Sequence, residues 1–324
     1  MSSVRNEKGI ALILVVLIVS VIVAITLELN LASRLQVYEA ANIRDGIKLE
    51  YIAKSGVYIG RSAIKEDDAA VDSFLEDWAQ ARELSVQSAS LFEGGFFELE
   101  IVDESGKIPV NALVDGNNFN DEMRELFVRF LSLPDFGLSE EEANDIVDAV
   151  KDWIDGDDEI TGFGAENNYY KGLDEPYPCK NAPLDCIEEL LLVKGMSREL
   201  FYGAGDRSGI ASYVTVYGNG KININTAPLP ILKVLAGGIT DEMAADMESY
   251  RKNEDNDLSD SLWYKDIAGM ADIDIDQELI AIKSSVFEIR STGRTGNMMR
   301  TITAIINRGE SSGGMPAITS WRVD

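Results

Sequence analysis

The pattern of apolar and polar positions opens with an apolar run over residues 10–27, in which only Ser20 and Thr26 are polar. At about 1.5 Å per residue, a helix of this length spans the hydrocarbon core of a bilayer. Apolar residues then recur at helical spacing to about residue 65, and no proline interrupts them. The pattern predicts one long helix over 10–65, a membrane anchor that continues outward as a stalk.

The next part of the chain mixes strand and helix patterns. SFLEDWAQARELSV predicts a short amphipathic helix, and the alternation over 96–102 predicts a strand that pairs with KIPVNAL in a hairpin. These elements form a first β region over 66–118. DEMRELFVRFLSL and LSEEEANDIVDAVKDWI predict two helices, and the second begins with a capping box, Ser139 and Glu142.

Two later segments predict helical hairpins: NAPLDCIEELLLVKGMSREL and NTAPLPILKVLAGGITDEMA. Between them, residues 208–224 predict a β-hairpin with a Gly-Asn-Gly turn. Another hairpin is expected over 281–310, followed by a flexible Gly-rich tail over 311–324. Helical material over 119–207 and 225–280 is thus inserted between strands, and the fold class is α+β.

The charge balance excludes several functions. The formal net charge is −27, from 56 acidic and 29 basic residues, which disfavours nucleic acid because binding phosphates requires Lys and Arg. His is absent, so hydrolases of the Ser-His-Asp type are excluded. The remaining residues form no catalytic constellation, and we expect no enzyme. An acidic exported chain favours a hard cation instead.

Two cysteines are present, Cys179 and Cys186, in a proline-containing loop. In an oxidising compartment they can close one short disulfide, and we expect this bridge. Free thiols are the alternative.

A leader over residues 1–9, MSSVRNEKG, precedes the apolar run. Arg5 and Lys8 favour a cytoplasmic position for this end, which predicts a single-pass membrane protein whose bulk is exported. A Gly directly before an apolar helix resembles the class III signal of type IV pilins and type II secretion pseudopilins. That resemblance implies cleavage by prepilin peptidase after Gly9, methylation of the new amine on Ile10, and a place in the inner membrane with the bulk in the periplasm. The alternative is a plain signal anchor.

Within DWIDGDDEITGFGAENNYY, oxygen ligands stand at positions 1, 3, 5, 7 and 12 of a twelve-residue loop, the spacing that wraps calcium in an EF-hand. These positions are Asp155, Asp157, Glu159, Thr161 and Glu166. Ile160 stands where an EF-hand has Gly, so the backbone path must differ. Few cations oppose the many carboxylates here, which favours a bound calcium ion. A solvated acidic loop is the alternative.

Four separated motifs resemble one family: GIALILVVLIV, GKIPVNAL, DWIDGDDEITGFGAENNYY and KININTAPLPIL. Their order is similar to general secretion pathway protein K, a minor pseudopilin of type II secretion. The resemblance implies a pilin-like fold, in which a long N-terminal helix packs on an antiparallel sheet, with a large helical insertion. It also implies calcium bound in the loop from Asp155 through Asn167. The implied partners are the pseudopilus, with minor pseudopilins similar to types I and J at its tip, and secreted substrates.

Leu14 supports a place at the tip. Most pilin-like subunits carry Glu five residues into the mature chain, where it neutralises the amine of a neighbouring subunit. Counted from Ile10, this chain has Leu14 there, which cannot pair with a buried charge. We therefore expect no subunit above it that requires pairing. A lipid-facing Leu is the alternative.

A competing function is DNA uptake by a type IV pilus-like minor pilin. The segment ININTAPLPILKVLAGGITDEMAADMESYR resembles a helix-hairpin-helix module, a unit that often binds phosphates. Asp241 and Glu242 follow its turn and would repel a phosphate backbone. A protein-facing role is therefore the stronger expectation, and we expect no nucleic-acid partner.

Overall fold

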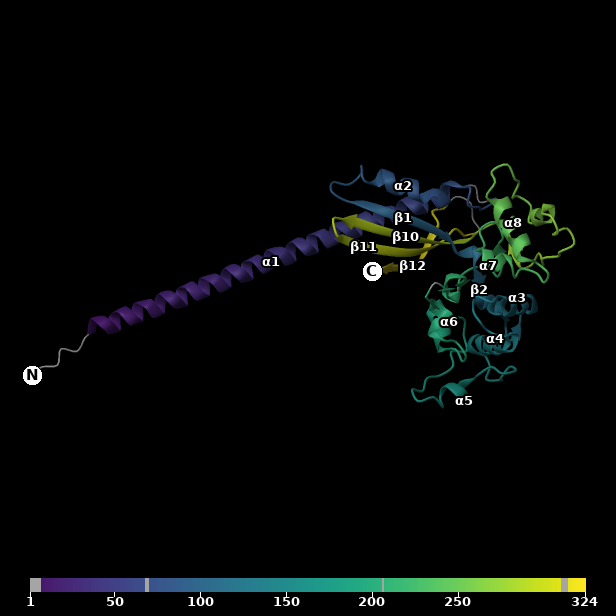
Figure 1. The fold of residues 1–324 in the computed structure, drawn as a ribbon, viewed down its shortest axis with the longest axis horizontal. Helices are drawn as coiled ribbons and strands as arrows, with labels where there is room; N and C mark the ends of the chain where they lie inside the picture. The colour runs from purple at the N-terminus through teal and green to yellow at the C-terminus, as the bar shows by residue number, and fades with distance from the viewer. Residues whose placement is uncertain (1–6, 68–69, 206, 310–313) are drawn as a thin grey trace, which may run out of the picture.

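A computed structural model describes residues 7–67, 70–205, 207–309 and 314–324. α1 (Glu7–Glu66) is one continuous helix of 60 residues, which confirms the predicted long helix over 10–65. Figure 1 shows its N-terminal part projecting far from the rest of the molecule. Among the described residues, this helix is the candidate membrane span, with a mean hydropathy of 3.4 in its most apolar window.

The C-terminal part of α1 packs on a four-stranded antiparallel sheet. The strand order is β1 (Phe96–Asp103), β10 (Val286–Thr295), β11 (Met298–Asn307) and β12 (Ala317–Val323). Alternate residues of β1 are buried, as its sequence pattern predicts. Ile52, Val57 and Ile64 of the helix share one apolar core with residues of β1, β10 and β11. The arrangement is the predicted pilin-like α+β fold.

Glycines allow α1 to approach the sheet closely. A Cβ built on Gly56 would lie 2.2 Å from Ser291 Oγ and 3.0 Å from the Phe97 ring. A Cβ on Gly293 of β10 would lie 2.4 Å from the Leu49 carbonyl oxygen. The lack of side chains at these positions therefore sets the distance between helix and sheet.

The C-terminal hairpin is confirmed, but the flexible tail is wrong. β10 and β11 pair over ten residues each and turn at Gly296, which has φ +52°. Half of the predicted tail forms β12, which pairs antiparallel with β11. The tail's sequence lacks strong alternation, and the strand forms because β11 offers it a free edge.

Two other predicted hairpins are wrong. β1 does not pair with the segment after it, because β10 takes its whole length and the chain turns away through a 3₁₀ turn at Glu104–Gly106. β2 (Ile108–Pro109) instead pairs in parallel with β7 (Val214–Thr215). Within the predicted 208–224 hairpin, β8 (Ile222–Asn223) pairs in parallel with β9 (Ile280–Ala281). Such short strands take their partners from the surrounding fold.

The insertion has a hydrophobic core of its own, which runs from Ile108 to Ile280. It therefore begins about ten residues before the predicted boundary at 118, and it includes the region predicted as a separate hairpin. Its remaining elements are η3 (Val110–Leu113), β3 (Val114–Asp115), β4 (Asn118–Phe119), α3 (Asp121–Leu131), α4 (Glu140–Ile154), α5 (Asn167–Tyr170), η4 (Ile187–Leu192), α6 (Arg198–Tyr202), β5 (Gly203–Ala204), β6 (Arg207–Ser208), η5 (Ile210–Ser212), α7 (Leu229–Leu232), α8 (Asp241–Arg251) and η6 (Trp263–Asp266).

The inserted helices follow the predicted segments. α4 begins with the predicted capping box, in which both the Ser139 and the Glu142 hydrogen bonds form. The first helical hairpin consists of η4 and α6, and the second of α7 and α8. Before the sheet, η1 (Asp77–Gln80) and α2 (Ala81–Ser88) occupy the predicted amphipathic segment. The insertion lies beyond the sheet at the end remote from the start of α1 (Figure 1).

Candidate functional site

Three of the predicted ligands meet where α4 ends and the acidic loop returns to α5. Asp155 caps the C-terminus of α4, and Glu166 precedes α5 as its N-cap residue. Carboxylate oxygens of Asp155, Asp157 and Glu166 all lie within 4.8 Å of one another. Asp155 and Glu166 are buried, with exposed fractions of 1% and 2%. The structure therefore brings the first, third and twelfth loop positions together.

The other predicted ligands point elsewhere. Glu159 is exposed, and its backbone N–H donates to Asp157 Oδ1 at 2.8 Å. The carbonyl of Thr161, the predicted ligand atom, accepts from Gly164 N at 2.7 Å. Asn167 donates through Nδ2 to Asp158 Oδ1 at 2.7 Å. With Ile160 at the sixth position, the left-handed turn falls at Gly162, with φ +50°, and the loop departs from an EF-hand there.

Lys151 and Asp152 also belong to the site, although the spacing pattern did not include them. The Lys151 ammonium donates to Asp155 Oδ2, and to Thr161 Oγ1 at 2.8 Å. Asp152 is fully buried and accepts from the Thr161 backbone N–H at 3.1 Å. The i, i+4 spacing of Lys151 and Asp155 on a helix is the sequence signal that could have found the ion pair.

Several carboxylate oxygens of this cluster are buried without a hydrogen-bond donor. Both carboxylate oxygens of Glu166, and Oδ1 of Asp155, are buried without a hydrogen-bond partner among the described residues. Burial, followed by the charges of Asp152, Asp155 and Asp158, raises the pKa of Glu166 to about 7. Unpartnered carboxylate oxygens converging on one point suit a hard cation with oxygen ligands, such as calcium. The residues present therefore fit the ion that the sequence predicts.

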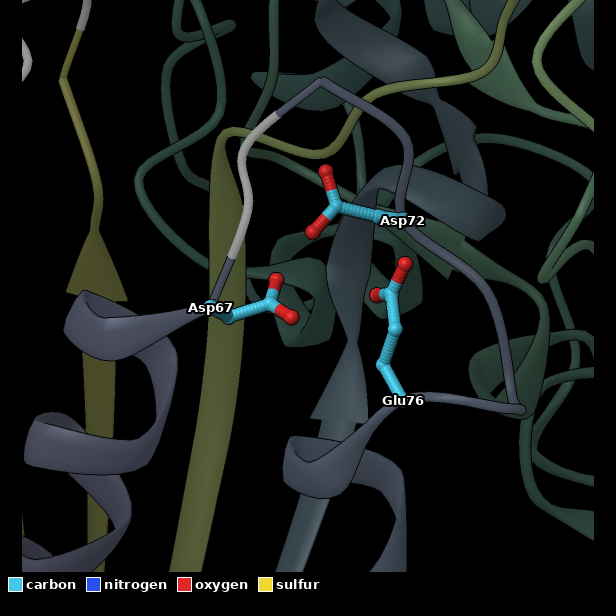
Figure 2. Close-up of side chains that lie close together, drawn as sticks. All are labelled: Asp67, Asp72 and Glu76. Carbon is cyan, nitrogen blue, oxygen red and sulfur yellow. The ribbon is translucent and has the colours of Figure 1, made fainter.

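A second acidic cluster, Asp67, Asp72 and Glu76, lies between the end of α1 and η1 (Figure 2). Arg308 already pairs with two of its three carboxylates. Arg308 donates to Asp72 Oδ1 at 2.7 Å and to Asp67 Oδ2 at 3.1 Å. Glu76 Oε2 accepts from Trp78 Nε1 at 2.7 Å. A guanidinium and an indole N–H thus already bind carboxylate oxygens of this cluster, and it is a weaker candidate for a metal site than the acidic loop.

The junction between sheet and insertion is a buried polar network around Asp103, the last residue of β1. Its Oδ2 accepts from the hydroxyls of Ser284 and Thr226, the latter at 2.5 Å, and its Oδ1 accepts from Ser105 N at 2.8 Å. Asn223 donates to the same carboxylate at 3.3 Å and to Ser284 Oγ at 2.7 Å. Burial raises the pKa of Asp103 to about 6. One carboxylate therefore joins three segments of the chain.

The structure does not form the predicted disulfide, and both cysteines are free thiols. Cys179 is buried, with Sγ 3.4 Å from the Asp152 carbonyl oxygen. Cys186 is exposed and begins η4. The two thiols fail to meet because one packs under the acidic loop while the other caps a surface helix. Burial raises the pKa of Cys179 to about 12.

The predicted processing region lies at the start of α1. Gly9 is half-buried, with nothing within 4 Å of a Cβ built on it. Ile10 and Leu14 are exposed, with fractions of 69% and 59%. Most of the leader, residues 1–6, lies outside the described residues.

Comparisons with known proteins agree with this architecture. The family model of type II secretion system protein K matches residues 106–217. Protein K of Aeromonas hydrophila is 24% identical over 96% of each chain. Protein K of Pseudomonas aeruginosa is 26% identical and covers 71% of this chain and 68% of its own. The predicted resemblance to type II secretion system protein K is confirmed.

A solved structure shows that the likeness extends to the fold. The match is to a chain of the GspK-GspI-GspJ complex of the enterotoxigenic Escherichia coli type 2 secretion system. The TM-score is 0.68 at 16% identity, covering 88% of this chain and 99% of the other. The long helix, the sheet and the helical insertion are thus a fold shared with a chain of that complex, in which GspK, GspI and GspJ assemble.

Proposed function

We propose that this chain is the minor pseudopilin at the tip of a type II secretion pseudopilus. It is anchored in the inner membrane by α1, with its bulk in the periplasm, and it assembles with minor pseudopilins resembling types I and J. The similarity to protein K supports this role. One observation carries it. The N-terminal part of α1 is an exposed apolar helix, its C-terminal part packs on a pilin-like sheet, and a large insertion lies beyond that sheet at the end remote from the start of α1 (Figure 1).

Placement at the tip also rests on Leu14. An unpaired buried charge costs several kcal/mol, so a subunit whose amine is buried beside this helix needs an acidic partner. Leu14 is exposed on α1 and supplies none. The insertion adds bulk at the far end, where a further stacked subunit would otherwise contact the sheet.

The assembly is tested by purifying the full-length chain in detergent after co-expression with the two minor pseudopilins. A stoichiometric complex is the expected result. If neither subunit copurifies with a folded chain, the proposed role is wrong.

We also propose that Asp155, Asp157 and Glu166 bind calcium. Their unpartnered oxygens support it, and the ion would offset the repulsion among the carboxylates. Lys151 would hold Asp155 in place through Oδ2 and leave Oδ1 free to bind the ion. Because the ion would tie the end of α4 to the start of α5, it would stabilise the insertion rather than perform chemistry.

Calcium should raise the melting temperature of the periplasmic part, residues 30–324. A ligand bound only by the folded state stabilises it by about 2.7 kcal/mol at a concentration of 100 Kd. The double variant Asp157→Ala with Glu166→Ala should lose this response. Glu159→Ala is the control, since it removes charge from an exposed position outside the cluster and should keep the response.

A solvated acidic loop gives the opposite result. Removing two negative charges would then raise the melting temperature without calcium, and millimolar calcium would leave the wild type unchanged.

We infer that the helical hairpins contact protein rather than DNA, and that the chain is a structural subunit rather than an enzyme. Lys233, between α7 and α8, pairs with Asp241 at 2.7 Å. The first turn of α8 is acidic. This hairpin therefore presents carboxylates where a phosphate-binding module needs positive charge.

A further inference from the structure

The two edge strands of the sheet differ in whether another segment covers their outward backbone groups. α2 lies along the β1 edge, where its serine hydroxyls accept hydrogen bonds from backbone N–H groups of β1 that face away from β10. Ser88 Oγ accepts from Phe97 N at 3.1 Å, and Ser85 Oγ accepts from Leu99 N at 2.7 Å. This edge is therefore closed to a further strand.

At the β12 edge, the register of β12 against β11 directs some backbone groups outward. Asp324 and Thr301 exchange both backbone hydrogen bonds, at 2.9 and 3.2 Å. In an antiparallel pair the hydrogen-bonded and non-hydrogen-bonded residues alternate. Trp321 pairs with Ala304 and Val323 with Ile302, so both residues of β12 direct their N–H and C=O groups away from β11. These groups form the start of a ladder for one more strand.

The side chains of β12 are also uncovered. Six of its seven residues are exposed. Ala304 and Ile302 face the core under α1, so their partners Trp321 and Val323 extend that apolar face, yet they remain 37% and 41% exposed. Met315, just before the strand, is 45% exposed. An added strand would cover apolar surface as well as pair the backbone.

The charged side chains around this edge indicate which side chains an added strand would carry. Arg300 is exposed on β11, next to the Thr301–Asp324 pair, and Arg322 is exposed on β12, where it bonds Asp324 at 3.1 Å. Asp324 offsets the charge of Arg322, so Arg300 supplies the positive charge at this edge. A strand with apolar and acidic side chains fits this edge.

We propose that β12 is a docking edge, to which an extended strand of a partner minor pseudopilin, apolar on one face and carrying acidic side chains, adds as the fifth strand of the sheet. This inference rests on the proposed function, since it names the surface through which the chain assembles. Main-chain hydrogen bonds supply the affinity in such strand addition, and the apolar face supplies the specificity.

The test uses full-length chain co-expressed with the two minor pseudopilins and purified in detergent. Trp321→Pro removes one outward N–H, and proline is tolerated at such edge positions. We expect this variant to lose the partner subunit. Trp321→Leu is the matched control, because it keeps the N–H and an apolar side chain, and it should retain the partner.

Hydrogen exchange on the wild type gives a second measurement that does not depend on the fold of a variant. On assembly, the amides of Trp321 and Val323 should become protected, whereas the Leu99 amide, already bonded to Ser85, should not change. If the wild type assembles while Trp321→Pro still binds and these amides stay unprotected, the docking edge is wrong and the proposed function stands. A partner helix seated elsewhere on α1 would give this result. If the wild type binds neither subunit, both proposals are wrong.

Discussion

Lys151 connects the end of α4 with the acidic loop that follows it. Its ammonium contacts Asp155 and Thr161, and both Lys151 and Asp155 are buried. The hydrogen bond to Thr161 thus joins the last turn of α4 to the middle of the loop, while the ion pair with Asp155 holds the end of the helix. A buried ion pair adds little net stability compared with apolar residues, but breaking it leaves an uncompensated charge.

Lys151→Met should therefore lower the free energy of unfolding in calcium-free buffer by about 3 to 5 kcal/mol. Urea unfolding of residues 30–324 measures the change. Lys171→Met removes the same charge from an exposed lysine after α5 and should change stability by less than about 0.5 kcal/mol. Equal effects of the two substitutions would show that only net charge matters in this region.

Asp103 makes the stability of the junction depend on pH. Its pKa is raised from 3.8 to about 6 in the folded state, so the folded protein takes up a proton between these values that the unfolded chain does not. The stability from this group is fully present below about pH 4 and is lost as the pH rises through about 6. Asp72 lies close and raises the same pKa further.

Asp103→Asn should remove this dependence. Relative to the variant, the wild type should gain of the order of 1 to 3 kcal/mol in free energy of unfolding between pH 7 and pH 4. Unfolding of both proteins at several pH values measures the difference. Parallel curves would mean that Asp103 keeps its charge in the folded protein across this range.

At the scale of elements, the contact between α1 and the sheet depends on glycine. Gly56 faces Ser291 and Phe97, whereas a Cβ on Gly46, almost three turns earlier, meets nothing within 4 Å. The same substitution should therefore have opposite effects at the two positions of one helix.

Gly56→Ala should destabilise the fragment of residues 30–324 by about 1 to 3 kcal/mol, because the added methyl group overpacks the interface. Gly46→Ala should stabilise it by up to about 1 kcal/mol, since alanine favours the helix and meets no obstacle. Thermal unfolding of both variants checks the pair. A stabilising Gly56→Ala would mean that the helix does not pack this closely on the sheet.

Elements with strong local signals could be predicted from sequence. The long α1, the capped α4 and the β10–β11 hairpin follow from periodicity, a capping box and a Gly turn. The two-residue strands and β12 could not, because their partners lie far away in the chain and their own sequences carry little pattern.

At the scale of the whole molecule, the apolar N-terminal part of α1 projects away from the folded body (Figure 1). Mass spectrometry of the mature protein should find Ile10 at the N-terminus with an added methyl group, because Gly9 directly precedes the apolar helix. Retention of Met1, or cleavage beyond Leu27, would instead indicate a plain anchor or an ordinary secretory signal.

The sequence by itself determined the long apolar N-terminal helix, the α+β class, the excess of acidic residues and the place of the acidic loop. These follow from composition and from patterns a few residues apart. It also named Asp155, Asp157 and Glu166, because these carboxylates stand at the first, third and twelfth positions of a recognisable twelve-residue spacing.

Only the tertiary structure decided which of the predicted ligands converge, and it added Lys151 and Asp152 to the site. It also kept the two cysteines apart, paired β1 with β10 and made a strand of the tail. These outcomes depend on side-chain direction and on contacts between segments distant along the chain. Local spacing leaves both unspecified, because a loop or an edge strand takes its conformation from what packs against it.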